Sequence, residues 1–386
     1  MKSDKTTPNV PTLRFQEFTD PWTLMPLKKL LCFQNGINAD SAKYGKGVKF
    51  ISVSDILNNQ YITYDCIKGM IDIDKKTMER FLVEYGDILF QRSSETFEDI
   101  GRANVYLDKE HPATFGGFVI RGKKISEYNP MFFRYLLCTP NARKQTVRMG
   151  AGAQHYNIGQ DGLGKISLYF PTIQEQQKIA GFLSAIDDRI SVQNKIISKY
   201  ETLIKGLCDM IFSSIEGNIL PLKAIASIEK GQQINGMSLA KTGKYYYLNG
   251  GIAPSGYIDD YNTSEETISI SEGGNSCGFV SYNIQKFWSG GHCYTLKIIT
   301  EQCRSKYLFF YLKYKEKDIM QLRVGSGLPN IQKKSLENFN VKLPNYKKQC
   351  FVERILEVIT AKKEIENALL ERFQSQKKFL LSKMFI

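Results

Sequence analysis

The sequence contains few residues that could form a catalytic or metal site within this chain, and their spacing does not suit such a site. Eight cysteines form no Cys-x-x-Cys pair, and three histidines leave only His292-Cys293 together, so neither a zinc site nor a histidine-based triad is predicted. No Walker-type phosphate loop occurs, and Asn129-Pro130 lacks the following Pro-aromatic that holds a flipped base for methylation. Asp72 and Asp74 come nearest to a nuclease centre and are interpreted as part of a surface turn. We expect no catalytic residue, no metal and no cofactor bound by this chain.

Basic and amide residues beside glycines and aromatics indicate a different chemistry, which is contact with nucleic acid. Lys and Arg neutralise phosphates, glycine lets backbone approach them, and Arg, Asn and Gln make paired hydrogen bonds to base edges. Each such segment taken alone is also typical of a solvated turn. The candidate DNA contacts are Lys43, Lys46, Lys49, Gln91, Arg92, Ser93, Arg102, Lys241, Lys244, Tyr245, Asn249 and Asn275.

The composition agrees with a globular protein that has a polyanionic partner. The 386 residues are enough for two or three domains, with 42% hydrophobic and 24% charged residues and a net charge of +13. Residues 1–171 carry +5, 172–213 carry 0, 214–344 carry +4 and 345–386 carry +4, so the excess is not one patch. A protein that spans a duplex would show this division, as would a generally basic surface. No membrane span and no secretory leader is found, and a cytoplasmic location is expected.

An internal repeat organises the chain. Pro26-Leu27-Lys28 recurs as Pro221-Leu222-Lys223 at an offset of 195, and from Asn157/Asn330 onward the offset settles at 173. The front part of the second copy is therefore shorter by about 22 residues, while the rear part keeps its length. Two related copies in one chain can be placed about a pseudo-two-fold axis.

The rear part of each copy is predicted to be a long helix. Thr172 and Glu175 form a Thr-x-x-Glu capping box after Pro171. Hydrophobic residues then recur at steps of four and three, the heptad pattern of a coiled coil, over a rod of about 60 Å. The expected seam comprises Ile179, Leu183, Ile186, Ile190, Ile197, Ile204 and Leu207 in the first helix and Leu356, Ile359 and Leu370 in the second. Neither helix can bury this stripe alone, so we expect them to pair, antiparallel if the copies are related by a two-fold axis; helices of two separate cores are the alternative.

The predicted fold class is α+β. Strand-like runs include 48–53, 87–90, 117–120, 245–248, 267–270 and 293–297, and each copy has a short helix, over 129–142 or 304–318. The predicted domains are two α/β parts, 1–171 and 214–344, each followed by a long helix, 172–213 and 345–386.

These motifs resemble the specificity subunit of type I restriction–modification enzymes over nearly the whole chain. The resemblance is carried by Pro11-Thr12-Leu13-Arg14-Phe15, Trp22, Gly86-Asp87-Ile88-Leu89-Phe90, Asn157-Ile158, Phe170-Pro171, Glu175-Gln176-Gln177-Lys178-Ile179-Ala180, Leu183, Ile186-Asp187, Asn249-Gly250-Gly251, Pro254-Ser255-Gly256-Tyr257 and Gly290-Gly291-His292-Cys293-Tyr294-Thr295-Leu296. The second copy departs from the pattern, with Lys347-Lys348-Gln349 in place of the Glu-Gln of the first.

The resemblance implies a non-catalytic subunit that binds double-stranded DNA, with one recognition domain for each half of a split target. It implies that the helices separate these domains and dock two methyltransferase subunits, which bind S-adenosylmethionine. Restriction subunits, with ATP and Mg, would join through the methyltransferase subunits. Two alternatives from other classes are kept: a stand-alone methyltransferase or nuclease with divergent motifs, and a coiled-coil interaction protein without DNA specificity.

Overall fold

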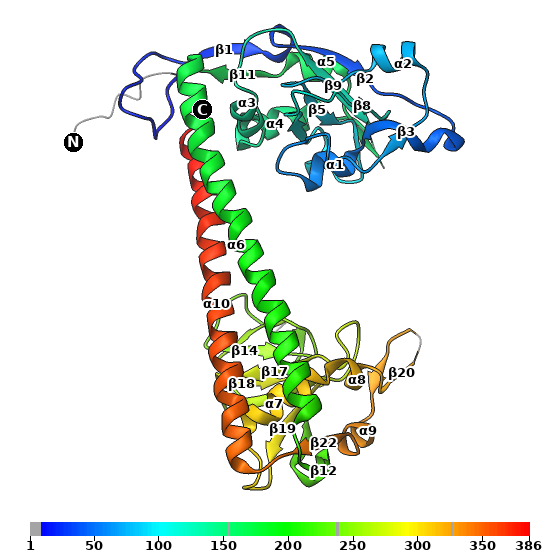
Figure 1. The fold of residues 1–386 in the computed structure, drawn as a ribbon. Helices are drawn as coiled ribbons and strands as arrows, with labels where there is room; N and C mark the ends of the chain where they lie inside the picture. Colours follow the sequence, from blue (N-terminus) through cyan, green and yellow to red (C-terminus); the bar gives the residue numbers. More distant parts are fainter. Residues whose placement is uncertain (1–8, 153–154, 237–238, 326) are drawn as a thin grey trace, which may run out of the picture. The chain divides into compact units, whose positions relative to one another are not determined.

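The structure is a computed structural model that describes residues 9–152, 155–236, 239–325 and 327–386. Residues 1–8, part of the segment in which no leader was found, lie outside this description. The chain forms two compact units (Figure 1): the first contains residues up to Asn194 together with Leu369–Ile386, and the second contains Lys195–Ala368. Two long helices, α6 (Ile173–Ser214) and α10 (Tyr346–Lys383), each contribute one part to either unit.

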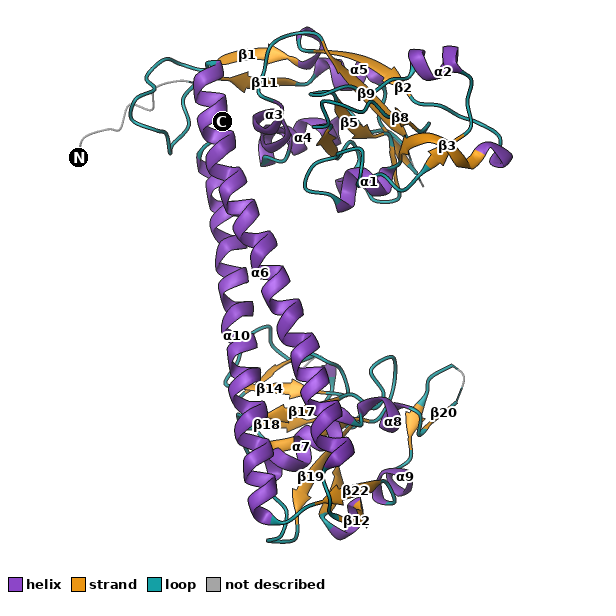
Figure 2. Ribbon diagram, in the orientation of Figure 1, coloured by secondary structure: helices purple, strands orange, loops and turns teal. Residues whose placement is uncertain are grey.

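The first unit combines short strands with short helices (Figure 2). Its strands are β1 (Thr23–Pro26), β2 (Leu31–Asn35), β3 (Tyr44–Ile51), β4 (Met70–Ile71), β5 (Ile88–Gln91), β6 (Ser93–Ser94), β7 (Ala103–Val105), β8 (Thr114–Phe115), β9 (Val119–Lys124), β10 (Tyr156–Asn157) and β11 (Ser167–Phe170). Its short helices are α1 (Val53–Asn58), α2 (Lys75–Arg80), α3 (Pro130–Leu137), α4 (Pro140–Arg148) and α5 (Gln160–Lys165).

The second unit has the same kinds of element. Its strands are β12 (Asn218–Pro221), β13 (Ala226–Lys230), β14 (Tyr245–Leu248), β15 (Gly256–Ile258), β16 (Thr267–Ser271), β17 (Val280–Asn283), β18 (Phe287–Ser289), β19 (Cys293–Ile298), β20 (Arg323–Val324), β21 (Asn330–Ile331) and β22 (Asn340–Leu343). Its short helices are α7 (Ser305–Tyr314), α8 (Glu316–Met320) and α9 (Lys333–Glu337).

The strand pairing repeats between the units in the same register. The four-stranded sheets have the orders β2-β9-β5-β7 and β13-β19-β16-β17. In the first, Ile88 lies between Gly122 and Val105; in the second, Ile268 lies between Leu296 and Tyr282. Smaller sheets correspond as well, because β3 and β14 each pair antiparallel with the next strand and parallel with a later one. The repeat found in the sequence is therefore a repeat of topology.

In each unit a two-stranded ladder pairs the strand by which the chain enters the α/β part with the strand by which it leaves. Strand β1 pairs with β11, with Thr23 opposite Phe170, and β12 pairs with β22, with Asn218 opposite Leu343. Both ladders lead directly into a long helix. The first residues of each α/β part are thus hydrogen-bonded to its last residues.

Three predictions needed correction. The single short helix expected over 304–318 is two helices, α7 and α8. Local signals explain the other two corrections. The single short helix expected over 129–142 is two helices, because Thr139 caps α4 with its hydroxyl and Pro140 occupies the first helical position, where no N–H is needed. The predicted capping box of α6 is only half formed. The Thr172 hydroxyl accepts from the Glu175 N–H, but the Glu175 carboxylate turns away to Arg14 at 2.8 Å and to Trp22, since a guanidinium is a stronger partner than a backbone amide.

A buried glutamine fixes the start of each long helix. The side-chain oxygen of Gln176 accepts from the Asn129 N–H at 2.9 Å, and its nitrogen donates to the Pro171 carbonyl at 3.0 Å. Gln349 repeats both bonds, with Arg304 at 2.9 Å and Pro344 at 2.8 Å. We call this pair of residues the glutamine clamps. Each one ties a long helix to the short helix that begins beside it.

The two long helices pack together and run antiparallel. In the first unit Asp187 of α6 pairs with Lys377 of α10, and in the second unit Glu201 pairs with Lys363. From the first ion pair to the second, the residue number rises by 14 on α6 and falls by 14 on α10. Fourteen residues are two heptads, so both ion pairs belong to one antiparallel register.

The predicted seam residues differ in burial along the helices. Ile179, Leu183 and Ile186 join the hydrophobic core of the first unit with Leu380, and Leu356 joins that of the second. Ile197 is also buried, whereas the remaining predicted seam residues are half-buried: Ile190, Ile204, Leu207, Ile359 and Leu370. The end of each helix nearer an α/β core is thus held by that core as well as by the partner helix.

Asp187 makes a buried anchor whose loss should be measurable. Its carboxylate accepts from the Tyr135 hydroxyl at 2.8 Å and pairs with Lys377. Replacing Asp187 with Ala is expected to lower the free energy of unfolding by about 2 kcal/mol, because both partners lose a buried acceptor. The matched change E201A breaks an exposed pair and is expected to cost less than about 1 kcal/mol. Urea unfolding of both variants is the measurement, and equal losses would contradict the prediction.

Candidate nucleic-acid interface

The segments singled out in the sequence lie at equivalent places in the two units. Gln91-Arg92-Ser93 ends and follows the central strand β5, and Ser271-Glu272-Gly273, which leads to the predicted contact Asn275, ends and follows the equivalent strand β16. Ser93 lies opposite Asn157, and Gly273 lies opposite Asn330. The main chain continues the match, since Ile158 donates to the Arg92 carbonyl at 3.0 Å and Ile331 to the Glu272 carbonyl at 2.8 Å.

A surface pocket opens at each of these strand ends. The first strand-end pocket has a volume of about 390 Å³ and is lined by Gln91, Ser93, Ser94, Glu95, Thr96, Asp99 and His155. The second strand-end pocket has a volume of about 420 Å³ and is lined by Lys230, Asn249, Glu272, Gly273, Gly274, His292, Leu328, Pro329 and Asn330. Both linings are rich in groups that form hydrogen bonds.

At the first pocket the predicted residues divide into structural and exposed ones. Gln91 is buried, and its side-chain nitrogen donates to the Ser93 carbonyl at 2.9 Å. The Arg92 guanidinium donates to the Gly117 carbonyl at 3.2 Å, so it supports a neighbouring loop. Arg102 is exposed and pairs with Asp99 at 2.6 Å; a hydrogen bond from Thr96 and the charge of Arg102 hold the pKa of Asp99 below its usual value.

The lysines in β3 and just before it also have different roles. Lys43 and Lys46 are exposed, and Lys46 pairs with exposed Asp72 at 3.2 Å. Lys49 instead donates to the Ile67 carbonyl at 2.6 Å. Gly47 has φ of +95°, and a Cβ there would stand 2.3 Å from a carbonyl oxygen of β4, so this strand requires glycine. Lys43 and Lys46 are the residues of this group that can reach a phosphate.

In the second unit the predicted residues gather beside β14. Lys241 and Lys244 are exposed, and the Lys244 ammonium lies 5.2 Å from the centre of the Tyr245 ring. Tyr245 packs on Tyr261 with ring centres 5.0 Å apart, and Lys286 lies 4.6 Å from the Tyr261 ring. Exposed cations interleaved with aromatic rings are suited to a nucleic-acid backbone. Lys286 was not foreseen, because it is distant in sequence from the Lys241–Tyr245 segment.

The two predicted asparagines of the second unit are separate. The Asn249 side-chain oxygen accepts from the His292 N–H at 3.1 Å and borders the second strand-end pocket. Asn275 is exposed on the loop that follows β16. Asn249 is therefore positioned by the fold, whereas Asn275 lies on the surface.

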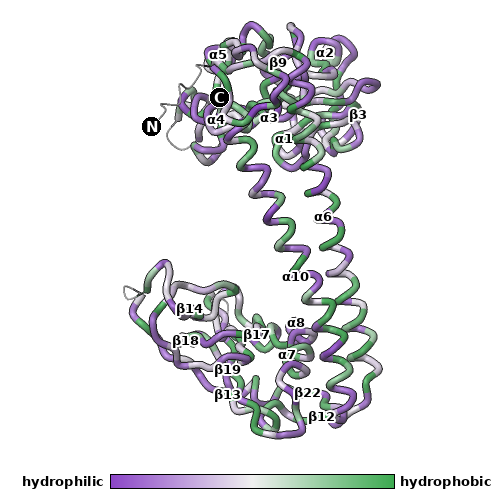
Figure 3. The backbone as a smooth tube through the Cα atoms, turned by 90° about the vertical axis from the view of Figure 1, so that its left-hand side faces the viewer, coloured by the Kyte–Doolittle hydropathy of each residue, from purple (hydrophilic) through white to green (hydrophobic). Residues whose placement is uncertain are grey.

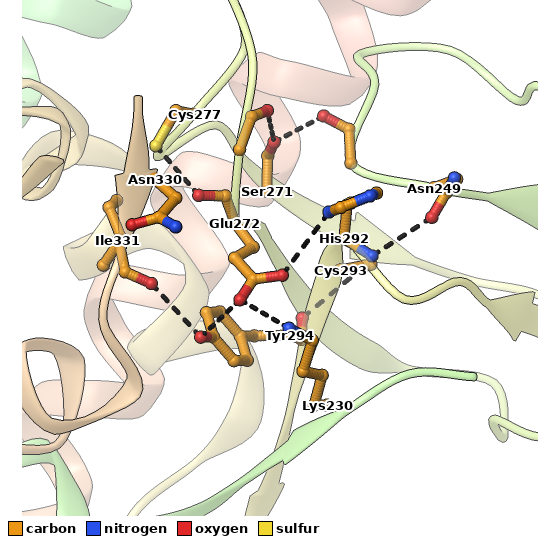
Figure 4. Close-up of polar contacts among 12 residues, drawn as sticks. Lys230, Asn249, Ser271, Glu272, Cys277, His292, Cys293, Tyr294, Asn330 and Ile331 are labelled. Carbon is orange, nitrogen blue, oxygen red and sulfur yellow. Dashed lines mark hydrogen bonds and ion pairs between the residues drawn. The ribbon is translucent and has the colours of Figure 1, made fainter. Parts of the chain in front are cut away.

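Sequence reasoning missed the most buried polar group of the second pocket. Glu272 is 8% exposed and accepts from the Lys230 ammonium at 2.7 Å and from the Tyr294 hydroxyl at 3.0 Å (Figure 4). The strand register explains the cluster. Lys230, Tyr294 and Ile270 lie directly opposite one another across β13, β19 and β16, and Glu272, two residues after Ile270, falls on the same face. Glu272 was missed because basic and amide residues were sought as DNA contacts, although this acid lies close to the predicted contact Asn275.

Two further observations concern metals and membranes. Among the described residues no group of three or more His, Cys, Asp or Glu side chains is arranged to hold a metal ion. No helix of the same described ranges is long and apolar enough to cross a membrane.

The sequence matches a known family twice. The type I restriction modification DNA specificity domain matches residues 20–202 and again residues 218–374. The chain belongs to this family and is a DNA specificity subunit of a type I restriction–modification system, with tandem target-recognition domains and no catalytic role of its own.

Relatives and solved structures agree with the assignment. The chain is 23% identical to the sequence named as the MjaX specificity subunit of Methanocaldococcus jannaschii, over 95% of this chain and 93% of the relative. A type I specificity subunit sequence of Mycoplasma pneumoniae is 32% identical over 39% of this chain, and the match spans 40% of that relative's length. The crystal structure of an S subunit from M. genitalium superposes with a TM-score of 0.69 at 18% identity, covering 98% of this chain and 99% of the other. A chain from a structural study of type I system assembly superposes with a TM-score of 0.56 at 13% identity, over 93% and 96% of the two chains.

The exposed lysines beside β14 provide a test of phosphate contact. In a K241A/K244A double variant, duplex binding by the chain in its native assembly is expected to weaken on all sequences alike, and the slope of log K against log salt is expected to fall by about two. The matched variant K333A/K334A removes the same charge from α9 and should leave the slope unchanged. Fluorescence anisotropy over a salt series measures both, and a changed sequence preference without a changed slope would contradict the prediction.

Proposed function

We propose that this chain recognises a bipartite duplex target, with one half-site bound by each unit. The observation that supports this most strongly is the shared register of the two four-stranded sheets, which brings the predicted contact segments to the same strand end twice. Two copies of one binding geometry in a single chain suit two half-sites on one duplex. The division of the positive charge between the two α/β parts favours the same conclusion.

Within each unit we assign phosphate and base contacts to different residues. Exposed lysines, such as Lys43 and Lys46 in the first unit and Lys241 and Lys244 in the second, position the backbone without sequence preference. The side chains of the strand-end pockets, among them Gln91 and Asn249, face base edges.

The long helices set the spacing between half-sites in this proposal. Their single antiparallel register makes residues 194–200 of α6 the counterpart of residues 364–370 of α10. Deleting both segments removes one heptad from each helix, about 10 Å of rise, or about three base pairs of duplex. The expected result is a target with a spacer shorter by about three base pairs and unchanged half-sites. Mapping of methylated adenines in cells that carry the variant is the measurement, and an unchanged spacer would contradict the role of the helices.

The helices also have an outer apolar stripe that the described part of the chain leaves uncovered. Phe351, Val358 and Ile365 recur at intervals of seven on α10 and are more than half exposed, and Leu203 and Met210 repeat the interval on α6. Figure 3 shows hydrophobic segments alternating with hydrophilic ones along both helices. Exposed apolar stripes of this kind favour a protein partner. We assign them to two methyltransferase subunits, which would supply S-adenosylmethionine; restriction subunits, with ATP and Mg, would join through these.

Polar substitution of the stripe should weaken that assembly. A V358S/I365S variant is expected to reduce copurification with the cognate methyltransferase subunits about tenfold or more, because two central apolar contacts are lost. The variant K362S/E364S changes two exposed polar residues of the same helix turns and is the control. Full assembly of V358S/I365S would contradict this assignment and indicate that the methyltransferase subunits dock on another surface.

The function itself is tested by activity of the assembled complex. Sequencing that detects methylated adenines is expected to show one split sequence that depends on this chain. Methyl transfer to DNA by the purified chain alone would support the stand-alone enzyme instead. Duplex binding without sequence preference by the assembled complex would support a coiled-coil interaction protein.

A further inference from the structure

At each strand-end pocket the described residues leave one buried acceptor oxygen without a hydrogen-bond partner. Among the described residues the buried side-chain nitrogen and oxygen atoms without a hydrogen-bond partner are Gln91 Oε1, Glu272 Oε2 and Arg121 Nε. Gln91 is the last residue of β5, whereas Glu272 directly follows the equivalent strand β16 and is therefore one register position further along. Both residues line the strand-end pockets. A buried polar atom without a partner costs about 1–3 kcal/mol, so an unpaired acceptor at the strand-end pocket of both units indicates a partner that arrives from outside.

The second pocket shows how its oxygen is held. Glu272 Oε1 receives both donors, Lys230 at 2.7 Å and Tyr294 at 3.0 Å. Oε2 has only the His292 Nδ1 atom at 3.7 Å, beyond hydrogen-bond distance (Figure 4). The His292 imidazole is 64% exposed and lines the same pocket as Glu272. The Lys230 ammonium balances the negative charge of the Glu272 carboxylate, which reduces the repulsion between this carboxylate and DNA phosphates.

The chemistry of these oxygens defines what they can bind. An ionised carboxylate accepts hydrogen bonds and donates none, and the free oxygen of Gln91 is likewise an acceptor. The donors that duplex DNA offers in its major groove are the exocyclic amino groups, N4 of cytosine and N6 of adenine. A glutamate accepts from cytosine N4, whereas a glutamine can also donate and pairs with adenine through N6 and N7.

We propose that Glu272 is the specificity-determining residue that binds an exocyclic amino group in the half-site of the second unit, and that Gln91, one register position earlier on β5, has the corresponding role in the first. This inference rests on the proposed function and names the base chemistry of its two sites. Because the two strand-end pockets lie in different units, each substitution serves as the control for the other.

The test uses the complete chain assembled with its methyltransferase subunits and a duplex library, with methylated adenines mapped by sequencing. E272Q keeps the size of the side chain but replaces one acceptor with a donor. It is expected to lose preference for an amino-bearing base at one position of one half-site, with about a 10- to 100-fold lower rate on the original target. Q91E is expected to change one position of the other half-site. In the wild-type map, a C·G pair at the affected position indicates cytosine N4 and an A·T pair indicates adenine N6.

A matched acid provides the control for charge. E229Q removes the same charge from strand β13 of the same sheet, where the alternation of side chains places Glu229 on the opposite face from Lys230. It should leave the target unchanged. If E272Q lowers expression, E272D is the variant to use instead. It shortens the side chain by one methylene and should relax base preference at the same position of the target.

The possible failures are distinguishable. If the wild-type complex shows no split target, the proposed function is wrong. If the wild-type target is split and both E272Q and Q91E retain it at the wild-type rate, the function stands and this inference is overturned. An E272Q effect spread over both half-sites would also overturn it, because a local base contact cannot act on the other half-site.

Discussion

The arrangement of each unit depends on one buried amide. Gln176 and Gln349 each accept from the N–H at the start of a short helix and donate to the proline carbonyl that precedes a long helix. An amide that meets both needs in the interior is costly to replace, because any substitute leaves buried backbone groups unpaired. The direction in which each long helix leaves its α/β core is therefore set by the same two bonds in both units.

Around this shared joint the two units differ in charge. The first stabilises its helix start with Glu175, which binds Arg14 and Trp22. The second has Lys348 at that position, which pairs with Glu216, while Glu353 binds Arg304 at 2.6 Å one turn later. The departure of the second copy from the Glu-Gln pattern thus changes the ionic partners of the joint and leaves its glutamine in place.

Much of the fold could be predicted because it depends on local patterns. Heptad spacing indicated both long helices, and alternating or continuous apolar runs indicated β14, β16 and β19 close to their observed bounds. The candidate site was less accessible to such reasoning. Lys49 and Arg92 were chosen for their charge, yet both hydrogen-bond to backbone carbonyls of distant segments. Glu272 was passed over for the opposite reason, since only the register of three strands brings Lys230 and Tyr294 beside it. Sequence patterns identify which segments are exposed, but the partners of a side chain follow from tertiary pairing.

The ladders β1–β11 and β12–β22 have a consequence for how such a protein can change over time. Because the first and last strands of each α/β part are hydrogen-bonded to each other, everything between them is a closed loop whose two ends stay side by side. Residues can be added to or removed from that loop without moving the helix that follows. The shorter second copy is an example, and it suggests that a new binding specificity can be inherited as an exchangeable insert on an unaltered frame.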